Sequence, residues 1–103
     1  MVEEVTRDTF ARQLNTPFRV AGYPASVATL ELVEASERRA LASHEIFSLV
    51  FRGPPDVVLP QATYRFEHHA IGAFDLFIVP IRQDSRGLYY EAVFNRLRQT
   101  NEG

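Results

Sequence analysis

Apolar and polar side chains alternate with a two-residue period over most of the chain. That period predicts strands in which one face packs on a core while the other faces water. The alternating segments are residues 18–20, 26–35, 45–52, 63–68, 73–81 and 88–96. Turn sequences separate them, and Gly53-Pro54-Pro55-Asp56 ends the third segment decisively.

The start of the chain has the period of a helix, which we expect at residues 6–15. Phe10 and Leu14 lie four residues apart and therefore share one face of it. Asn15 and Pro17 end the helix. Because so short a helix has little stability alone, we expect its apolar face to dock on another element.

Short connections decide how the last three strands pair. The connection 69–72 and the hairpin loop 83–87 are too short for the crossover that parallel strands need. The three strands therefore form an antiparallel meander. Residues 36–44 are charged and contain alanine, which predicts a loop or a single helical turn there.

Together these elements predict one domain over residues 1–103 with a mainly β fold. We expect an antiparallel six-stranded barrel or curved roll over residues 18–96, closed by one short N-terminal α-helix. Residues 99–103 are polar and are expected to fray.

The last two strands are apolar on both faces, which is the most informative physical feature of the chain. Strand 73–81 carries Phe74, Leu76 and Ile78 on one face and Phe77, Val79 and Ile81 on the other. Strand 88–96 sets Leu88, Tyr90, Ala92 and Phe94 opposite Tyr89 and Val93. An antiparallel sheet normally leaves one face in water, so something is expected to cover the second set.

Two alternatives could cover this second face: the N-terminal helix together with barrel curvature, or a partner subunit on an exposed apolar patch. The candidate interface residues are Phe77, Val79, Ile81, Tyr89 and Val93. Pro80 lies among them, and because it lacks an N–H it predicts an edge strand or a bulge.

Composition narrows the possible partners. The formal charge of the 103 residues is −2 at pH 7, and no basic stripe is present, so we expect no nucleic-acid partner. The absence of cysteine excludes disulfides, thiolate zinc sites and cysteine nucleophiles. No apolar run approaches the ~20 residues of a membrane helix, and the first residues lack a secretory signal pattern. We therefore expect a cytoplasmic protein that binds no membrane.

Candidate chemistry is sparse. His68 and His69 are adjacent, so within a strand their rings would point to opposite faces and could not chelate one metal ion. Asp75 and Glu91 lie among apolar neighbours without any motif that marks a catalytic pair. We therefore expect no metal and no other cofactor, and the sequence favours a protein that is not an enzyme.

Four stretches carry a resemblance to a known family: FSLVFRGP at residues 47–54, LPQATYRFEH at 59–68, LFIVPI at 76–81 and YEAVFNR at 90–96. They resemble a family of small bacterial proteins of unknown function, and the similarity spans nearly the whole chain. The family has no established activity to transfer. Its relatives are encoded beside proteins with phage tail-collar-like domains, which implies an assembly or accessory role.

These observations lead to a non-enzymatic interaction or accessory module, which self-associates as a homo-oligomer or joins a larger, phage-tail-like assembly. The alternative is a barrel that binds a small apolar ligand lined by Tyr64, Phe66 and Tyr90. The least favoured function is a hydrolase-type enzyme that uses Glu67 with His68 or His69.

Overall fold

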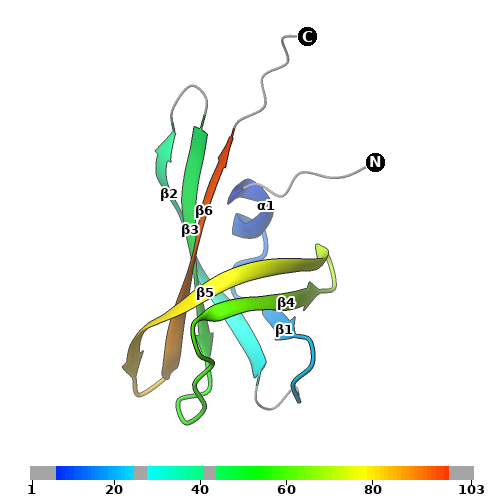
Figure 1. The fold of residues 1–103 in the computed structure, drawn as a ribbon, viewed down its shortest axis with the longest axis vertical. Coiled ribbons are helices and arrows are strands. Elements are labelled where there is room, and N and C mark those ends of the chain that lie inside the picture. The colour runs from blue at the N-terminus through cyan, green and yellow to red at the C-terminus, as the bar shows by residue number, and fades with distance from the viewer. Residues whose placement is uncertain (1–6, 25–27, 41–43, 98–103) are drawn as a thin grey trace.

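The alternating segments pair into a closed antiparallel barrel (Figure 1). The structure, a computed structural model, describes residues 7–24, 28–40 and 44–97. Its elements are α1 (Arg7–Ala11), β1 (Pro17–Val20), β2 (Thr29–Ala40), β3 (His44–Gly53), β4 (Ala62–His68), β5 (Gly72–Asp84) and β6 (Gly87–Leu97). Around the barrel the strand order is β1-β2-β3-β6-β5-β4. The predicted mainly β barrel with one short helix is confirmed for the described residues.

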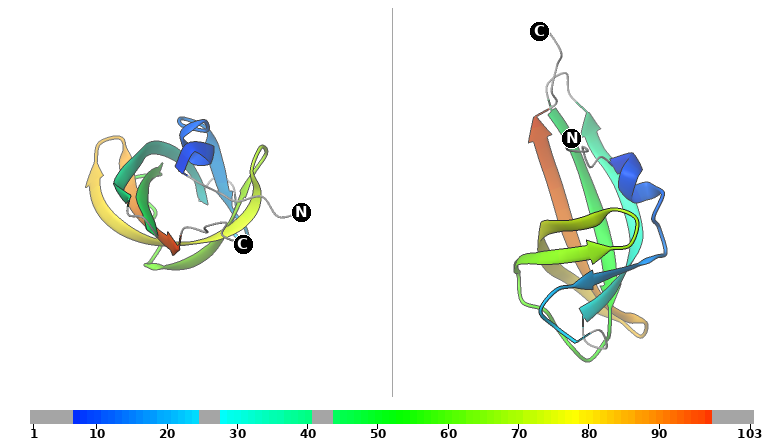
Figure 2. Two further views of the ribbon diagram at one scale, coloured as in Figure 1. Left: turned by 90° about the horizontal axis from the view of Figure 1, so that it is seen from above. Right: turned by 90° about the vertical axis from the view of Figure 1, so that its right-hand side faces the viewer.

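The predicted meander of β4, β5 and β6 is also confirmed, but β5 changes partner along its length. Gly72 to Ile78 pair with β4, whereas Val79 to Asp84 pair with β6. Strand β6 continues along β3 beyond the point where β5 leaves it. The upper parts of β2, β3 and β6 consequently form a three-stranded arm above the barrel (Figures 1 and 2).

The expectation of a loop or helical turn at residues 36–44 is wrong for residues 36–40 and 44, which the structure describes. Ser36 to Ala40 continue β2, and His44 already belongs to β3. The pairs Ser36↔Ser48 and Ala40↔Glu45 show the ladder running through this charged stretch, with a bulge on the way. Pairing with the apolar strand β3 therefore overrides the low strand propensity of its charged residues.

Some predicted segments lie partly outside the described residues: residue 6 of the helix, 26–27 of the second strand, 41–43 of the expected loop, and the tail 99–103.

The inward faces of the strands form one hydrophobic core that fills the barrel. Its fully buried strand residues include Phe18, Val20, Leu30, Leu32, Phe47, Leu49, Phe51, Phe66, Ile78 and Tyr90. The interior of a six-stranded barrel is narrower than the eight-stranded interiors that side chains can just fill, so a packed core is the expected outcome.

Helix α1 completes this core where the arm rises from the barrel. The fully buried ring of Phe10 lies with its centroid 5.5–6.3 Å from those of Phe18, Phe47, Phe74 and Phe94. Phe47 and Phe94 are themselves stacked across β3 and β6, with centroids 4.5 Å apart. Phe10 therefore covers inward-facing rings of the arm, and Figure 2 shows α1 beside the arm.

The helix is shorter than the predicted span of 6–15. After Ala11 the backbone tightens, because the N–H of Gln13 donates to the carbonyl of Phe10 three residues back. Asn15 adopts φ 67°, a left-handed conformation that ends the turn, and its N–H donates to the carbonyl of Leu32. One consequence is that Leu14 does not share the buried face of Phe10 but is exposed.

Two details of the second half follow from its turn and breaker residues. The sequence predicted an edge strand or a bulge at Pro80. Because the barrel is closed, β5 is not an edge strand, and Pro80 lies at a bulge between the register pairs Pro80↔Tyr90 and Arg82↔Tyr89. The following hairpin is tighter than the predicted loop 83–87, because Asp84 already pairs with Gly87.

The position of Phe10 predicts its energetic weight. We expect Phe10→Ala to lower the free energy of unfolding by about 3–5 kcal/mol, because it opens a cavity between four aromatic rings. Urea denaturation measures this loss. The matched control is Leu14→Ala, which removes an exposed side chain close by in the chain and should cost under about 1 kcal/mol. Equal losses in the two variants would contradict the packing described above.

Candidate functional site

Four of the five candidate interface residues reach the outer surface of β5 and β6. The exposed fraction is 51% for Phe77, 50% for Val93 and 40% for Ile81, and Val79 is half-buried. Phe77 and Val93 each lie two residues beyond the last register pair of the two strands, Val79↔Glu91. These four residues, which we call the outer patch, therefore flank the point where β5 and β6 separate.

Helix α1 does not provide the second cover that the sequence left open. Its Phe10 packs on the inward-facing rings, and the helix contacts β2 and β3. The outer patch lies on the other side of the sheet, where its side chains remain exposed.

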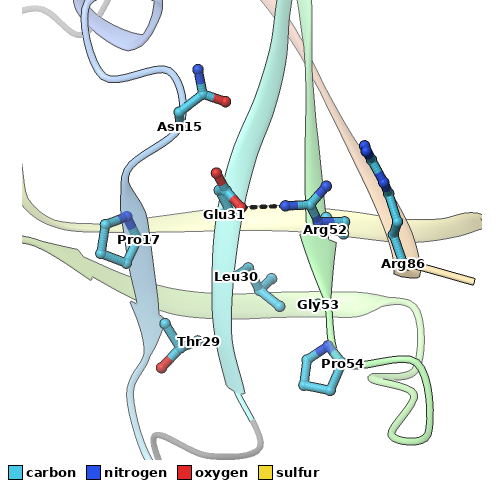
Figure 3. A pocket seen from close by; sticks show the side chains of 9 residues that line it. All are labelled: Asn15, Pro17, Thr29, Leu30, Glu31, Arg52, Gly53, Pro54 and Arg86. Carbon is cyan, nitrogen blue, oxygen red and sulfur yellow. Dashed lines mark hydrogen bonds and ion pairs between the residues drawn. The ribbon is translucent and has the colours of Figure 1, made fainter.

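A cleft of about 440 Å³ opens on the outside of the barrel at the opposite end from the arm (Figure 3). It forms where the β2–β3 ladder stops, because Glu31↔Arg52 is its last register pair on that side. Strand β3 ends one residue later, at Gly53, and Pro54 follows it. The guanidinium of Arg52 reaches back across the cleft and donates to the carboxylate of Glu31.

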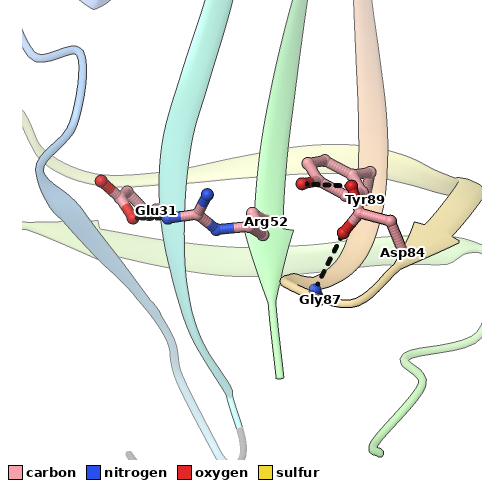
Figure 4. A network of polar contacts seen from close by, with 5 residues as sticks. All are labelled: Glu31, Arg52, Asp84, Gly87 and Tyr89. Carbon is pink, nitrogen blue, oxygen red and sulfur yellow. Dashed lines mark hydrogen bonds and ion pairs between the residues drawn. The ribbon is translucent and has the colours of Figure 1, made fainter. Parts of the chain in front are cut away.

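The same arginine begins a polar row that explains why Tyr89 is not part of the outer patch (Figure 4). Cross-strand pairing sets Arg52 beside Tyr89, and Tyr89 beside Arg82. The guanidinium of Arg82 lies 4.2 Å from the centroid of the Tyr89 ring, a cation–π contact. Tyr89 is thus only 5% exposed and is covered by its own chain.

Asp84 fixes the far end of this row. Its carboxylate accepts a hydrogen bond from the Tyr89 hydroxyl at 3.0 Å. It also accepts hydrogen bonds from the backbone N–H groups of Arg86 and Gly87 at 2.8 and 3.2 Å. The hydrogen bond from the Arg86 N–H is the largest cause that lowers the pKa of this carboxyl, and the bonds from Tyr89 and Gly87 add to it. The hydrogen bonds that Arg52 donates to Tyr89 and to Glu31 raise the pKa of its guanidinium, which stays charged.

A second cleft, of about 580 Å³, brings together the residues considered for hydrolysis. Glu67, His68 and His69 all line it. Glu67 is engaged by Arg19, whose guanidinium donates to it at 3.3 Å on the neighbouring strand β1. The two histidine rings do not diverge, because His69 lies in the turn after β4 and stacks on His68 with centroids 4.5 Å apart.

His68 is a structural residue with both ring nitrogens in use. Its Nδ1 accepts the backbone N–H groups of Ala70 and Ile71 at 3.0 and 3.3 Å. The proton therefore lies on Nε2, which contacts the Thr16 hydroxyl at 2.9 Å, and that hydroxyl donates to the carbonyl of Gln13. The ring ties the β4–β5 turn to the turn after α1. Burial lowers the pKa of His68, and the neighbouring His69 lowers it further.

This arrangement predicts a pH-dependent stability. The pKa of His68 is lower in the folded than in the unfolded chain, so below about pH 6.5 the unfolded chain binds the proton first. We expect the free energy of unfolding to fall between pH 7.5 and 5.5, by at most about 1.4 kcal/mol per pH unit. Denaturation at several pH values measures this slope.

The variant His68→Asn should flatten the slope, because an amide oxygen can accept the two N–H groups but does not titrate. The control, His69→Asn, should leave most of it, because burial is the main cause of the lowered pKa of His68. An unchanged slope in His68→Asn would exclude this histidine as its source.

The aromatic residues considered for ligand binding belong to the core and its edge. Phe66 and Tyr90 are fully buried. The Tyr90 hydroxyl accepts the N–H of Leu59 at 3.0 Å, which ties the 54–61 connection to the barrel. Tyr64 packs against the core and donates its hydroxyl to the carbonyl of Pro60.

The described residues contain neither a metal-binding cluster nor a membrane-spanning helix. No group of three or more histidine, aspartate or glutamate side chains is placed to hold a metal ion in that part of the chain. Within the same ranges, no helix has the length and apolarity needed to cross a bilayer.

Sequence patterns missed the cleft beside Glu31 and Arg52. Its residues come from β1, β2, β3, the β5–β6 hairpin, the turn before β1 and the connection after β3, and nothing in their spacing brings them together. The only available signal was Gly53-Pro54, which marks the end of a strand but not what opens beside it.

Comparison with known proteins gives one match. The sequence profile of a family described as a domain of unknown function, DUF6916, matches residues 5–94. This confirms the resemblance to a family of unknown function. No curated protein and no solved structure matches the chain.

Proposed function

The chain belongs to the DUF6916 family, which assigns it no activity, and we propose that it is a non-enzymatic interaction module that self-associates through the outer patch. The observation that carries this proposal is the exposure of Phe77, Val93 and Ile81 on one side of the barrel. Contiguous apolar surface of this kind, bordered by polar residues, marks interaction sites in soluble proteins.

Charge around the outer patch favours a second copy of the chain as the partner. On one side, Arg65 and Asp75 form an ion pair at 3.2 Å. On the other side lie Arg82 and Asp84, which attract each other. Each border carries both signs of charge, and Glu91, the cross-strand partner of Val79, lies between them, so two copies that meet face to face can set arginine against carboxylate. A two-fold dimer needs such a self-complementary surface.

The small size of the outer patch sets the strength of association. Stable interfaces bury about 1,200–2,000 Å² in total, which is more than four side chains and their borders provide. We therefore propose a reversible dimer that forms at concentrations of about micromolar or above.

The other two functions have less support. An apolar-ligand barrel would need room beside Phe66 and Tyr90, but these side chains are part of a filled core. A hydrolase would need a free carboxylate beside a histidine in the second cleft, but Glu67 is paired with Arg19, and both nitrogens of His68 have hydrogen-bond partners. The cytoplasmic location and the role in a larger assembly stay predictions from the sequence.

Two matched variants test the proposal. Val93 and Val58 have similar exposure, 50% and 55%, but Val58 lies in the connection after β3, outside the outer patch. We expect the wild-type mass in light scattering to rise above that of one chain with concentration. Val93→Asp should weaken this association at least about tenfold, because it places a carboxylate at the centre of the interface, whereas Val58→Asp should not.

Phe77→Ser serves as a second variant, on the other strand of the outer patch, and should also weaken association. Circular dichroism of each variant confirms that the fold is intact. A wild-type protein that stays monomeric at millimolar concentration, or equal behaviour of Val93→Asp and Val58→Asp, would refute the proposal.

A further inference from the structure

The cleft beside Glu31 and Arg52 differs from the outer patch in chemistry, because it gathers charged side chains around a hollow. Its volume of about 440 Å³ lies within the range of sites for small molecules. The floor is formed where β2 and β3 have stopped pairing, next to Leu30 and Gly53. Pro17 and Pro54 give it apolar walls (Figure 3).

Arg86 is a charged lining residue of this cleft whose guanidinium has no partner among the described residues. It lines the cleft from the β5–β6 hairpin, and Figure 3 shows it on the side of Arg52 that faces away from Glu31. Within the described ranges, the structure gives its exposed guanidinium no hydrogen bond and no ion pair. The hairpin itself is held in place, because the carboxylate of Asp84 accepts the backbone N–H of Arg86.

Arg52 supplies a second, permanently charged guanidinium. This guanidinium donates to Glu31 and also hydrogen-bonds Tyr89, but it carries five N–H donors in a planar fork. With Arg52, Arg86 and Glu31 as the charged lining residues, the cleft has an excess of one positive charge. Its charge complement is a single negative charge.

We propose that this cleft binds a small monoanionic carboxylate between Arg52 and Arg86, with the rest of the ligand against Pro54. Arginine pairs with carboxylates through two parallel hydrogen bonds, which fits a planar group held from two sides. A phosphate dianion fits less well, because its second charge would face the carboxylate of Glu31. The amide of Asn15, which also lines the cleft, is a further hydrogen-bonding group for the ligand.

The test uses benzoate, a monoanion with an apolar ring, and its neutral isostere benzamide. Two-dimensional NMR follows the backbone N–H groups of Gly53 and Gly87 and the arginine side-chain N–H groups during titration. We expect saturable shifts with benzoate at a dissociation constant of about a millimolar, and no saturation with benzamide. Inorganic phosphate at the same ionic strength should bind more weakly than benzoate.

The variant Arg86→Gln separates this site from general attraction of anions. The side chain of Arg86 is exposed and has no hydrogen bond or ion pair within the described residues, so the variant should fold, and its affinity for benzoate should fall about tenfold or more. Arg65→Gln removes the same charge from β4, away from the cleft, and should leave the affinity unchanged. Equal losses in the two variants, binding of benzamide as strong as that of benzoate, or tighter binding of phosphate would each overturn the proposal.

The source of the carboxylate is a separate arm of the experiment. A short peptide ending in phenylalanine with a free C-terminal carboxylate is compared with the same peptide as a C-terminal amide. If the free acid binds more tightly than benzoate, the cleft takes a protein-borne carboxylate. If benzoate binds at least as well, it takes a free small molecule. This proposal does not depend on self-association, because no residue of the outer patch lines the cleft.

Discussion

The barrel depends on one strand, β5, that pairs with two different neighbours. Its first part, up to Ile78, pairs with β4, and its second part, from Val79, pairs with β6. The pairing with β4 is needed because β4 also pairs with β1, which closes the barrel. The departure of β5 from β6 frees the upper part of β6, whose inner face then needs another cover. Phe10 supplies it by packing among the rings that the arm and the barrel direct inward. A short N-terminal helix is therefore part of the closure rather than an addition to a finished barrel.

The same departure explains where apolar surface remains. Where two strands stay paired, side chains on the outer face cover one another, and even Val50, in the middle of the sheet, is buried. At the separation of β5 and β6 this mutual cover ends, which leaves Phe77 and Val93 exposed on diverging strands. Tyr89, which lies where the strands are still paired, is covered by Arg82. The exposed surface thus follows from topology and not from hydrophobic content alone.

Much of this fold was predictable, because the two-residue alternation of apolar and polar side chains indicates which residues face the core. The strands and their meander required only periodicity and short loops, and the missing N–H of Pro80 limited that residue to an edge strand or a bulge, of which the structure has the bulge. The strand at residues 36–40 was not predictable in this way, because its pairing depends on β3, a separate strand. The expectation that Tyr89 belongs to an exposed interface was wrong for a similar reason, because its ring is covered by Arg82, which lies across a hairpin and a bulge. Local pattern cannot show contacts that long-range register creates.

The polar row from Glu31 through Arg52 and Tyr89 also separates the two proposed surfaces. At one end it borders the cleft, where Arg52 is held by Glu31. At the other end Arg82 lies over Tyr89 and borders the outer patch. Because each residue of the row is held by a neighbour in its own chain, a ligand in the cleft need not displace a residue of the patch. Binding of a carboxylate and pairing of two copies are therefore compatible in one molecule, and each can fail without the other.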